Sequence, residues 1–308
     1  MKFELTILGS NSALPKVNRF STAQILNVSE QLFLIDCGEG TQIQLRRFKI
    51  KFSKINHIFI SHLHGDHIYG LPGLISTFNL LGRKKSLHIY CHSSFEKILS
   101  TLLNSLEGHL NYQIIYHHTN TNNKKLIFEN KIITVEAFPL KHKLATTGFL
   151  FKEKQQLPTL RKDKLEFYNI PLTLRKGIKE GNNFTTNDGK TIPNSELTKE
   201  LITPRSYAFC SDTQYSKKTA NYIKNVDLLY HEATFLENMK SRANETKHST
   251  AKDAAKVAKE ANVKTLLIGH YSSRYNKTNK HVVEAKEVFE NIFAVEDGFK
   301  FAIKNKLR

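Results

Sequence analysis

The 308-residue sequence contains no tryptophan, only two methionines and only three cysteines. Cys37, Cys91 and Cys210 are odd in number and far apart, which excludes a disulfide framework and a Cys-x-x-Cys zinc site. Apolar runs of the roughly 18 residues that a membrane span needs are also missing. The segment Met1 to Ser10 contains an acidic residue and is typical of a first strand, not of a signal peptide. We therefore expect reduced, buried cysteines in a cytoplasmic protein with no membrane partner.

Acidic side chains are scarce relative to basic ones. Lys and Arg number 46 against 28 Asp and Glu, which gives a formal net charge of +18. A field of this sign favours polyanionic partners, and nucleic acid is the leading candidate. A lysine-rich soluble surface explains the same composition, so charge alone does not settle the partner. With 40% hydrophobic residues, the chain can bury one large core or two modest ones.

Short apolar runs alternate with segments of helical periodicity, which predicts an α/β fold. Strands are expected at Phe3 to Leu8, Leu32 to Ile35, His57 to Ile60, Leu87 to Tyr90, Gln113 to Tyr116, Ile132 to Phe138, Ser206 to Cys210, Asp227 to His231 and Thr265 to Gly269. Helices are expected at Thr41 to Phe48, Leu71 to Leu80, Ser94 to Ser105, Thr250 to Glu260 and Lys280 to Ile292. The polar stretch Thr119 to Lys125 is interpreted as a hairpin loop.

The apolar runs thin out between Lys152 and Pro204. From Lys152 to Glu180, eight Lys or Arg stand against four acidic residues. Regular strands and helices resume on the far side, so we predict one domain over residues 1–308 with an inserted basic arm at about 152–204. A solvated charged insertion without a partner is the alternative.

The most informative motif follows the apolar run Ile58 to Ile60. His62, His64, Asp66 and His67 place four potential metal ligands within six positions. Alternation directs the first two to one side, and the intervening glycine lets the backbone turn so that the last two face a second position. Neutral imidazoles suit Zn²⁺, and a carboxylate beside them can complete a site or take a proton from water. A chance cluster in a polar loop is the alternative, because the chain has 14 histidines.

Three further candidates each follow an expected strand. His142 comes after an apolar segment that ends at Leu140, Asp212 comes after the strand ending at Cys210, and His270 directly follows Gly269. Taken singly, each is typical of a capping or turn residue. The repeated position at the carboxyl ends of strands, where open α/β sheets form their sites, favours metal binding instead.

The ordered set His62-x-His64-x-Asp66-His67, His142, Asp212 and His270 resembles the metallo-β-lactamase superfamily over nearly the whole chain. Finer segments are similar to short-form ribonuclease Z, namely Gly9 to Pro15, Phe33 to Gln42, Cys210 to Thr213, His231 to Phe235, His248 to Thr250 and Gly269 to Tyr275. The resemblance implies an αββα sandwich of two sheets that carries the basic arm.

The resemblance also implies a ligand set for two zinc ions per subunit. One ion would be held by His62, His64 and His142, the other by Asp66, His67 and His270, with Asp212 bridging both and Asp36 orienting the ligands from behind.

The activity implied by the resemblance is a zinc-dependent endoribonuclease. Such an enzyme cuts precursor tRNA after the discriminator base and leaves a tRNA 3′-hydroxyl, and two metals can supply hydroxide near neutral pH. The departing 3′-oxygen needs a proton, for which His248 is the candidate acid, with Glu232 fixing its tautomer. Asp66 could accept the proton of the attacking water. The alternative interpretation makes Glu232 a helix-start or ion-pair residue and places His248 in an exposed region before a helix that Ser249 or Thr250 could cap.

The inserted arm would clamp precursor tRNA through phosphate contacts, and DNA is not an expected partner. Its Ile170-Pro171-Leu172 replaces the Gly-Pro pair usual near the tip of the ribonuclease Z arm. The resemblance also implies a homodimer. Substrate contacts are expected from Arg161, Lys162, Lys164, Arg175, Lys176, Lys179 and, near the reaction centre, Arg274, whose alternative is a surface ion pair.

Three other functions fit part of the pattern. A phosphodiesterase of small or cyclic nucleotides would use the same ligands but would not need the basic arm. An RNA-binding module without turnover would have no reason to keep the complete ligand set. A thioester or lactam hydrolase would leave both the arm and the segment His231 to Phe235 unexplained.

Overall fold

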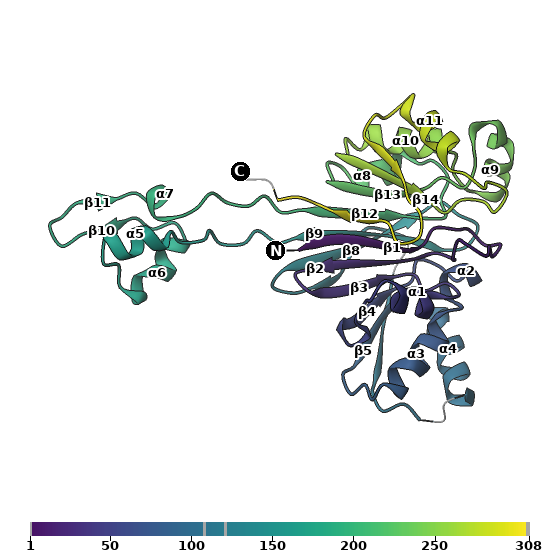
Figure 1. The fold of residues 1–308 in the computed structure, drawn as a ribbon, viewed down its shortest axis with the longest axis horizontal. Coiled ribbons are helices and arrows are strands. Elements are labelled where there is room, and N and C mark those ends of the chain that lie inside the picture. The colour runs from purple at the N-terminus through teal and green to yellow at the C-terminus, as the bar shows by residue number, and fades with distance from the viewer. Residues whose placement is uncertain (1, 107–108, 120–121, 306–308) are drawn as a thin grey trace.

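The computed structural model describes residues 2–106, 109–119 and 122–305. Two seven-stranded sheets pack face to face, helices cover their outer faces, and a long arm projects from one end (Figure 1). This confirms the predicted αββα sandwich of two sheets with an inserted arm. Within the described residues, no helix combines the length and the apolar character required to span a bilayer.

The first sheet has the order β16-β1-β2-β3-β4-β5-β6. Its first four strands are antiparallel neighbours, and β3 to β6 run parallel. The strands are β1 (Phe3–Gly9), β2 (Ala23–Val28), β3 (Gln31–Ile35), β4 (Ile55–Phe59), β5 (Leu87–Cys91), β6 (Ile114–His118) and β16 (Lys300–Ala302). The helices of this half are α1 (Thr41–Arg47), α2 (Gly65–Ile68), α3 (Leu71–Leu80) and α4 (Ser93–Leu106), with a 3-10 turn at Phe52–Lys54.

The second sheet has the order β15-β14-β13-β12-β9-β8-β7. Strands β12 to β15 run parallel, and β7, β8 and β9 join them as antiparallel neighbours. The strands are β7 (Lys125–Glu129), β8 (Ile133–Leu140), β9 (Thr146–Glu153), β12 (Ser206–Cys210), β13 (Leu228–Glu232), β14 (Thr265–Gly269) and β15 (Ile292–Ala294). The helices are α8 (Lys217–Tyr222), α9 (Lys240–Thr246), α10 (Ala251–Glu260) and α11 (Asn279–Lys286), with a 3-10 turn at Glu237–Met239.

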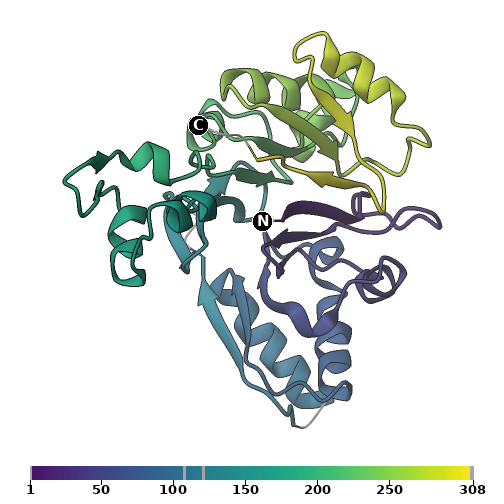
Figure 2. The ribbon, with the colours of Figure 1, turned by 60° about the vertical axis from the view of Figure 1, so that its left-hand side comes forward.

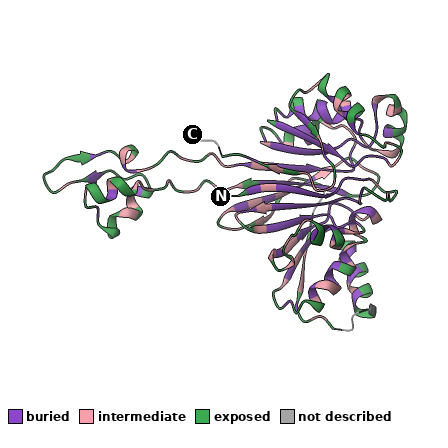
Figure 3. Ribbon diagram, viewed as in Figure 1, coloured by how far each residue is buried: buried purple, intermediate pink, exposed green. Residues whose placement is uncertain are grey.

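Aromatic side chains fill the space between the sheets. Phe59 stacks on Tyr90 with ring centroids 4.4 Å apart, and Phe209 stacks on Tyr230 at 5.4 Å. Separate apolar layers lie outside the sheets, one beneath α1, α3 and α4 and the other beneath α8, α10 and α11. The central strands are therefore covered on both faces, as the buried colour in Figure 3 shows, which explains why many of them are continuous apolar runs in the sequence.

The arm leaves the second sheet after Glu153 and returns at Ser206. Two extended segments form a stalk that carries a small head, seen from a second direction in Figure 2. The head contains α5 (Lys162–Phe167), α6 (Leu172–Lys179), β10 (Phe184–Thr185), β11 (Thr191–Ile192) and α7 (Asn194–Leu197). It has its own apolar cluster, formed by Leu165, Ile170, Ile178, Phe184, Ile192 and Leu197.

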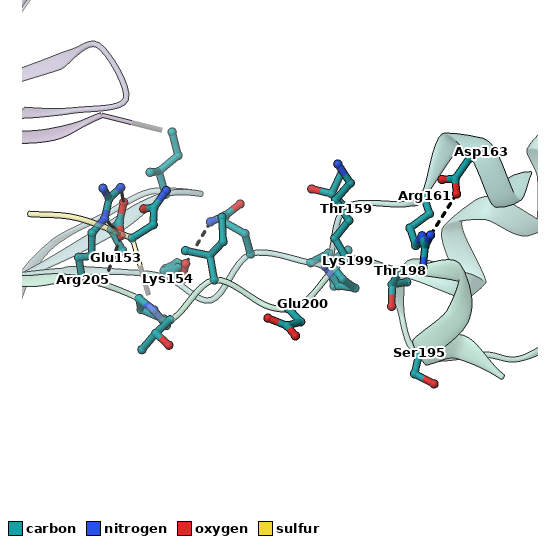
Figure 4. A pocket seen from close by; sticks show the side chains of 18 residues that line it. Glu153, Lys154, Thr159, Arg161, Asp163, Ser195, Thr198, Lys199, Glu200 and Arg205 are labelled. Carbon is teal, nitrogen blue, oxygen red and sulfur yellow. Dashed lines mark hydrogen bonds and ion pairs between the residues drawn. The ribbon is translucent and has the colours of Figure 1, made fainter. Parts of the chain in front are cut away.

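A cavity of about 790 Å³ runs along the stalk (Figure 4). At its sheet end, Arg205 and Glu153 form a buried ion pair with Nη2 and Oε1 2.6 Å apart. At its head end, Arg161 pairs with Asp163 at 3.1 Å. The backbone N–H of Lys199 donates to the carbonyl of Thr159 at 2.7 Å, so the two segments of the stalk are also joined between these ends.

Three sequence predictions need correction. The stretch 119–125 is not a hairpin loop, because β6 and β7 lie at the edges of different sheets, and residues 120 and 121 lie outside the described residues. The helix expected to reach Ile292 ends at Lys286, since Ile292 begins β15 beside β14. Lys152 and Glu153 do not belong to the arm, because both pair with β8 as the end of β9.

Candidate metal centre and substrate cleft

The histidine-rich motif lies where the parallel strand β4 ends. The chain leaves the sheet after Phe59, and His64 precedes the one-turn helix α2, which contains Asp66 and His67. Gly65 at the start of α2 leaves room for the ring of Tyr69, since a Cβ there would lie 2.1 Å from a ring carbon and would displace the ring. The short helix directs Asp66 and His67 inward, where both are buried.

The first ligand group consists of three imidazoles and one carboxylate oxygen. Nε2 of His62 lies 2.8 Å from Nδ1 of His64, and Nε2 of His142 lies 3.4 Å from the same atom. Oδ1 of Asp212 lies 3.7 Å from Nε2 of His62 and 3.8 Å from Nε2 of His142. His142 and Asp212 follow β8 and β12, so the second sheet supplies half of this group.

The second ligand group uses the other carboxylate oxygen of Asp212. Its Oδ2 lies 3.0 Å from Nε2 of His67 and 3.2 Å from Nε2 of His270. Oδ2 of Asp66 lies 3.4 Å from each of these two nitrogens. The two oxygens of one buried aspartate therefore face two separate groups, which is the geometry of a bridging ligand.

The donor atoms of both groups fit a cation better than they fit one another. In each group the candidate ligand atoms lie within 4.8 Å of one another. Nε2 of His67 is buried and has no hydrogen-bond partner among the described residues. Imidazole nitrogens and carboxylate oxygens are the ligands that Zn²⁺ takes in proteins, and a buried polar atom without a partner is otherwise costly.

Hydrogen bonds from behind fix the orientation of the imidazoles. Nδ1 of His67 lies 2.7 Å from Oδ2 of Asp36, and the hydroxyl of Ser61 donates to the same oxygen at 2.9 Å. Nδ1 of His142 lies 2.9 Å from the carbonyl oxygen of Lys247. When Nδ1 carries the proton and donates it to an oxygen, the lone pair of Nε2 is directed into the group, as in many metal sites.

Three residues of the site have a left-handed backbone. The φ angles of Asp36, Asp212 and His270 are 55°, 56° and 59°. This conformation is uncommon for residues other than glycine, and the strain persists only where the surrounding structure imposes it. Asp36 and His270 directly follow the last residue of a strand and Asp212 comes one residue later, so the sharp turn directs each side chain across the end of the sheet instead of along it.

His248 lies beside the first group and is held by a buried carboxylate. Its Nδ1 is 2.9 Å from Oε1 of Glu232, which also accepts the backbone N–H of Thr213 at 2.7 Å. Oε2 of Glu232 accepts the Thr234 hydroxyl at 2.5 Å and the backbone N–H of Ser249 at 3.1 Å. Thr250 caps α10 directly after this segment, with the Thr250–Asp253 capping box, so the cap and the histidine are neighbouring but separate features.

The electrostatics of the site follow from burial and close opposite charge. Burial alone raises the pKa of the Asp212 carboxyl, but the imidazoles of His270 and His67 outweigh it and hold the pKa well below its usual range. Burial lowers the pKa of His62 well below its ordinary value. Burial also acts against the charged form of His248, but the carboxylate of Glu232 outweighs it and raises the pKa of His248 to about 9.

A cleft of about 520 Å³ opens over both ligand groups. Its lining includes Asp66, Asp212, His248, His270 and, farther out, Arg274. The Arg274 side chain forms no ion pair within the described residues. Its guanidinium carbon lies 5.1 Å from the centre of the Phe235 ring, and the exposed side chain borders the cleft.

The predicted basic residues of the arm all lie on its head, and they differ in what they contact. Lys164 lies 3.0 Å from Glu196 of α7, and the Arg175 guanidinium donates to the carbonyl of Ile170 at 3.3 Å. Arg161 and Lys176 form exposed ion pairs with Asp163 and Glu180. Lys162 and Lys179 are exposed and have no ion-pair partner among the described residues.

Sequence reasoning missed the residues that connect these groups. The Thr234 hydroxyl lies 3.0 Å from Nδ1 of His270 and donates to Glu232, so it joins the second ligand group to the His248 pair. Thr234 belongs to the segment His231 to Phe235, whose resemblance to ribonuclease Z assigns no role to this residue. The carbonyl of Lys247 carries no sequence signal, because any residue could supply it.

Comparison with known proteins identifies the chain. A family model described as "Anti-Pycsar protein Apyc1" matches residues 3–159, which include the histidine-rich motif and end before Asp212 and His270. Two relatives named "Ribonuclease Z" are 45% identical to this chain. The relative from Phocaeicola vulgatus matches over 304 residues, which are 99% of this chain and 98% of the relative. The relative from Bacteroides fragilis matches over 296 residues, which are 96% of this chain and 97% of the relative. The chain belongs to the ribonuclease Z family.

A solved structure gives the same family and fold. The short form of human tRNase Z is 26% identical, with a TM-score of 0.72 over 98% of this chain and 99% of that chain. A ribonuclease Z with this architecture is a hydrolytic endoribonuclease, and the ligand groups described above lie in the part of the fold that the two proteins share.

Proposed function

We propose that this ribonuclease Z hydrolyses the phosphodiester 3′ of the discriminator base of precursor tRNA, which removes the 3′ trailer and leaves a 3′-hydroxyl on the tRNA. The observation that carries the proposal is a pair of ligand groups sharing Asp212, in a chain 45% identical to proteins named ribonuclease Z over nearly its full length. Precursor tRNA is accordingly the proposed partner.

Two zinc ions per subunit are the proposed cofactor. His62, His64, His142 and Asp212 would hold one ion, and Asp66, His67, His270 and the second oxygen of Asp212 the other. Bound there, zinc would lower the pKa of water and neutralise charge that develops on the phosphoryl group. Asp36 orients His67 from behind, and its buried carboxylate accepts hydrogen bonds from Ser61 as well.

The chain's own residues supply the proton of the leaving group. Oε1 of Glu232 accepts the Nδ1–H of His248, so a proton on Nε2 of His248 is available to the ribose 3′-oxygen that leaves. Asp66 lines the same cleft as His248 but belongs to the half built on the first sheet, and it can accept a proton from the attacking water. Arg274 borders the cleft and can bind a phosphate beside the cut.

We propose the arm as the exosite for the folded part of tRNA. Of its basic side chains, Lys162, Lys176 and Lys179 are exposed and lack buried partners, so they suit contacts to phosphate. Lys164 and Arg175 have in addition a structural contact within the head, to Glu196 and to the carbonyl of Ile170. Arg161 stands at the base of the head, where it pairs with Asp163.

The direction of β12 supports a homodimer. The arm enters β12 at Ser206, and Asp212 follows the other end of the same strand. A five-residue strand separates the two points by roughly 17 Å, and the stalk leads away from the metal ligands (Figure 1). An arm that extends away from its own cleft is better placed to hold tRNA for the cleft of a second copy.

The first experiment is cleavage of a 3′-extended precursor tRNA transcript by the purified protein, with and without chelator. We expect a chelator-sensitive cut after the discriminator base, with a 3′-hydroxyl on the tRNA and a 5′-phosphate on the trailer. Activity on small phosphodiesters alone would contradict the proposed substrate.

The homodimer proposal has its own test. One variant keeps Thr159 and Lys199 and replaces residues 160–198 between them by a short turn, which is feasible because these two residues are already hydrogen-bonded. A second variant keeps the arm and carries His248→Ala. If the arm serves the partner's cleft, mixing the two inactive variants restores cleavage in the heterodimer. No recovery, with heterodimers demonstrated by mass, would contradict an arm that acts on the partner.

A phosphodiesterase of small or cyclic nucleotides remains the second candidate, because an open cleft of about 520 Å³ accepts a small phosphodiester as well. Salt dependence discriminates between the two. Engagement of tRNA by the arm releases counterions and makes the KM steeply salt-dependent, whereas a small substrate gives a shallow dependence.

A further inference from the structure

Tyr69 presents an exposed aromatic ring at the edge of the cleft. The residue is 71% exposed, and its side chain lines the same cleft as Asp66, Asp212 and His248. Within the described residues, neither its ring nor its hydroxyl has a stacking or hydrogen-bond partner. Because this large ring is exposed, it contributes little buried apolar area to the stability of the fold. Its place beside the reaction centre therefore favours a role in binding.

The backbone of α2 holds this ring in place. The N–H of Tyr69 donates to the carbonyl of Gly65 at 2.9 Å, which closes the helical turn. The ring lies over the Cα of Gly65, where an added Cβ would be 2.1 Å and 2.4 Å from two ring carbons. One face of the ring is therefore supported by the turn that carries Asp66 and His67, and its position is tied to that of the ligands.

The other aromatic side chain of the cleft is covered. Phe235 is 5% exposed and lies beneath the guanidinium of Arg274. Phe235 and Arg274 belong to the half of the molecule built on the second sheet, and Tyr69 belongs to the half built on the first. A substrate lying across the ligand groups would meet a cation on one side and an open aromatic face on the other.

We infer that Tyr69 is a positioning residue that stacks on the unpaired base next to the scissile phosphate. The inference rests on the proposed function, because it requires a single-stranded RNA end that lies across the cleft. Single-stranded RNA is bound by stacking of unpaired bases on aromatic side chains, and such stacking tolerates any base because every base has a π-face. The contact would hold the flexible 3′ end in line without reading its sequence.

The test measures kcat and KM on precursor tRNA for Tyr69→Phe, Tyr69→Leu and Tyr69→Ala. Loss of one stacked base predicts that kcat/KM falls about 5- to 150-fold in Tyr69→Ala, mainly through KM. Tyr69→Phe keeps the ring and should stay near wild type, and Tyr69→Leu, which still covers Gly65, should resemble Tyr69→Ala. The control is Leu80→Ala at the far end of α3, a side chain that is 86% exposed and does not line the cleft, and it should behave as wild type.

Abasic substrates identify the base. Precursor tRNA lacking the base either of the discriminator or of the first trailer nucleotide is cleaved by wild type and by Tyr69→Ala. At the stacked position, removal of the base should lower kcat/KM of the wild-type protein by about the same factor as Tyr69→Ala does. The same abasic substrate should lower kcat/KM of Tyr69→Ala no further. The stacking role is overturned if the loss from Tyr69→Ala and the loss from the missing base multiply at both positions. It is also overturned if Tyr69→Ala loses bound zinc. A wild-type protein that leaves precursor tRNA uncut would instead refute the proposed function itself.

Discussion

Replacement of His248 by alanine tests the proposed acid most directly. The imidazole is 16% exposed, and its Nδ1 lies 2.9 Å from a fully buried Glu232 carboxylate that is also bound by two backbone N–H groups. A positioned acid contributes about 10²- to 10⁴-fold, which corresponds to about 2.7 to 5.4 kcal/mol in the activation barrier. We therefore expect kcat for precursor tRNA to fall by that factor in His248→Ala, with bound zinc and tRNA affinity near wild type.

The leaving group provides the decisive assay. A phosphodiester whose leaving group is a stable phenolate needs no proton, so His248→Ala should slow its hydrolysis much less than it slows cleavage of precursor tRNA. Glu232→Gln should reduce cleavage through the same histidine, and the double variant should be no slower than His248→Ala alone. Equal losses on both substrates, or loss of zinc, would refute the role of acid and make His248 a ligand or a structural residue.

Three further outcomes follow from the packing and from the ligand groups. Gly70→Ala places a Cβ 2.1 Å from the carbonyl oxygen of Gly38 and should destabilise the fold by about 1 to 3 kcal/mol in denaturant titration. Arg205→Met removes the guanidinium that pairs with the buried Glu153 carboxylate and donates to the Ile303 carbonyl, at a cost of about 3 to 5 kcal/mol, and Glu153→Leu in the same chain should recover most of it. Chelation of zinc should lower the melting temperature, since a ligand at 1,000 times its Kd contributes about 4 kcal/mol, and a melting curve unchanged by chelator would contradict tight binding.

The sequence predicted many of the strands that are covered on both faces, but it missed β2 and β9, which are buried along most of their length. Strands β12 and β14 begin and end at the predicted residues, because a strand buried between two layers is a continuous apolar run with polar neighbours at both ends. The candidate ligands could be proposed for the same reason, since His62, Asp212 and His270 each follow such a run.

The remaining features depend on contacts between distant residues. Strand β7 was not predicted, because three of its five residues are exposed and its place at the edge of the second sheet is set by pairing with β8. The contact of Lys164 with Glu196 spans 32 positions and gives this lysine an acidic partner within the head, which composition cannot reveal. The orientation of the His142 ring is fixed by the backbone carbonyl of Lys247, 105 positions away. Every residue type has such a carbonyl, so the sequence gives no signal for this contact.

Each ligand group draws side chains from both halves of the sandwich. His62 and His64 follow β4 of the first sheet, while His142 and Asp212 follow β8 and β12 of the second. The apolar core between the sheets is non-directional, so it holds the halves together without fixing their angle at the cleft. Ions bound in the two groups would add directional links at that one edge. Loss of metal should therefore loosen the cleft before it unfolds the core, and hydrogen exchange in α2 and around His270 should rise first.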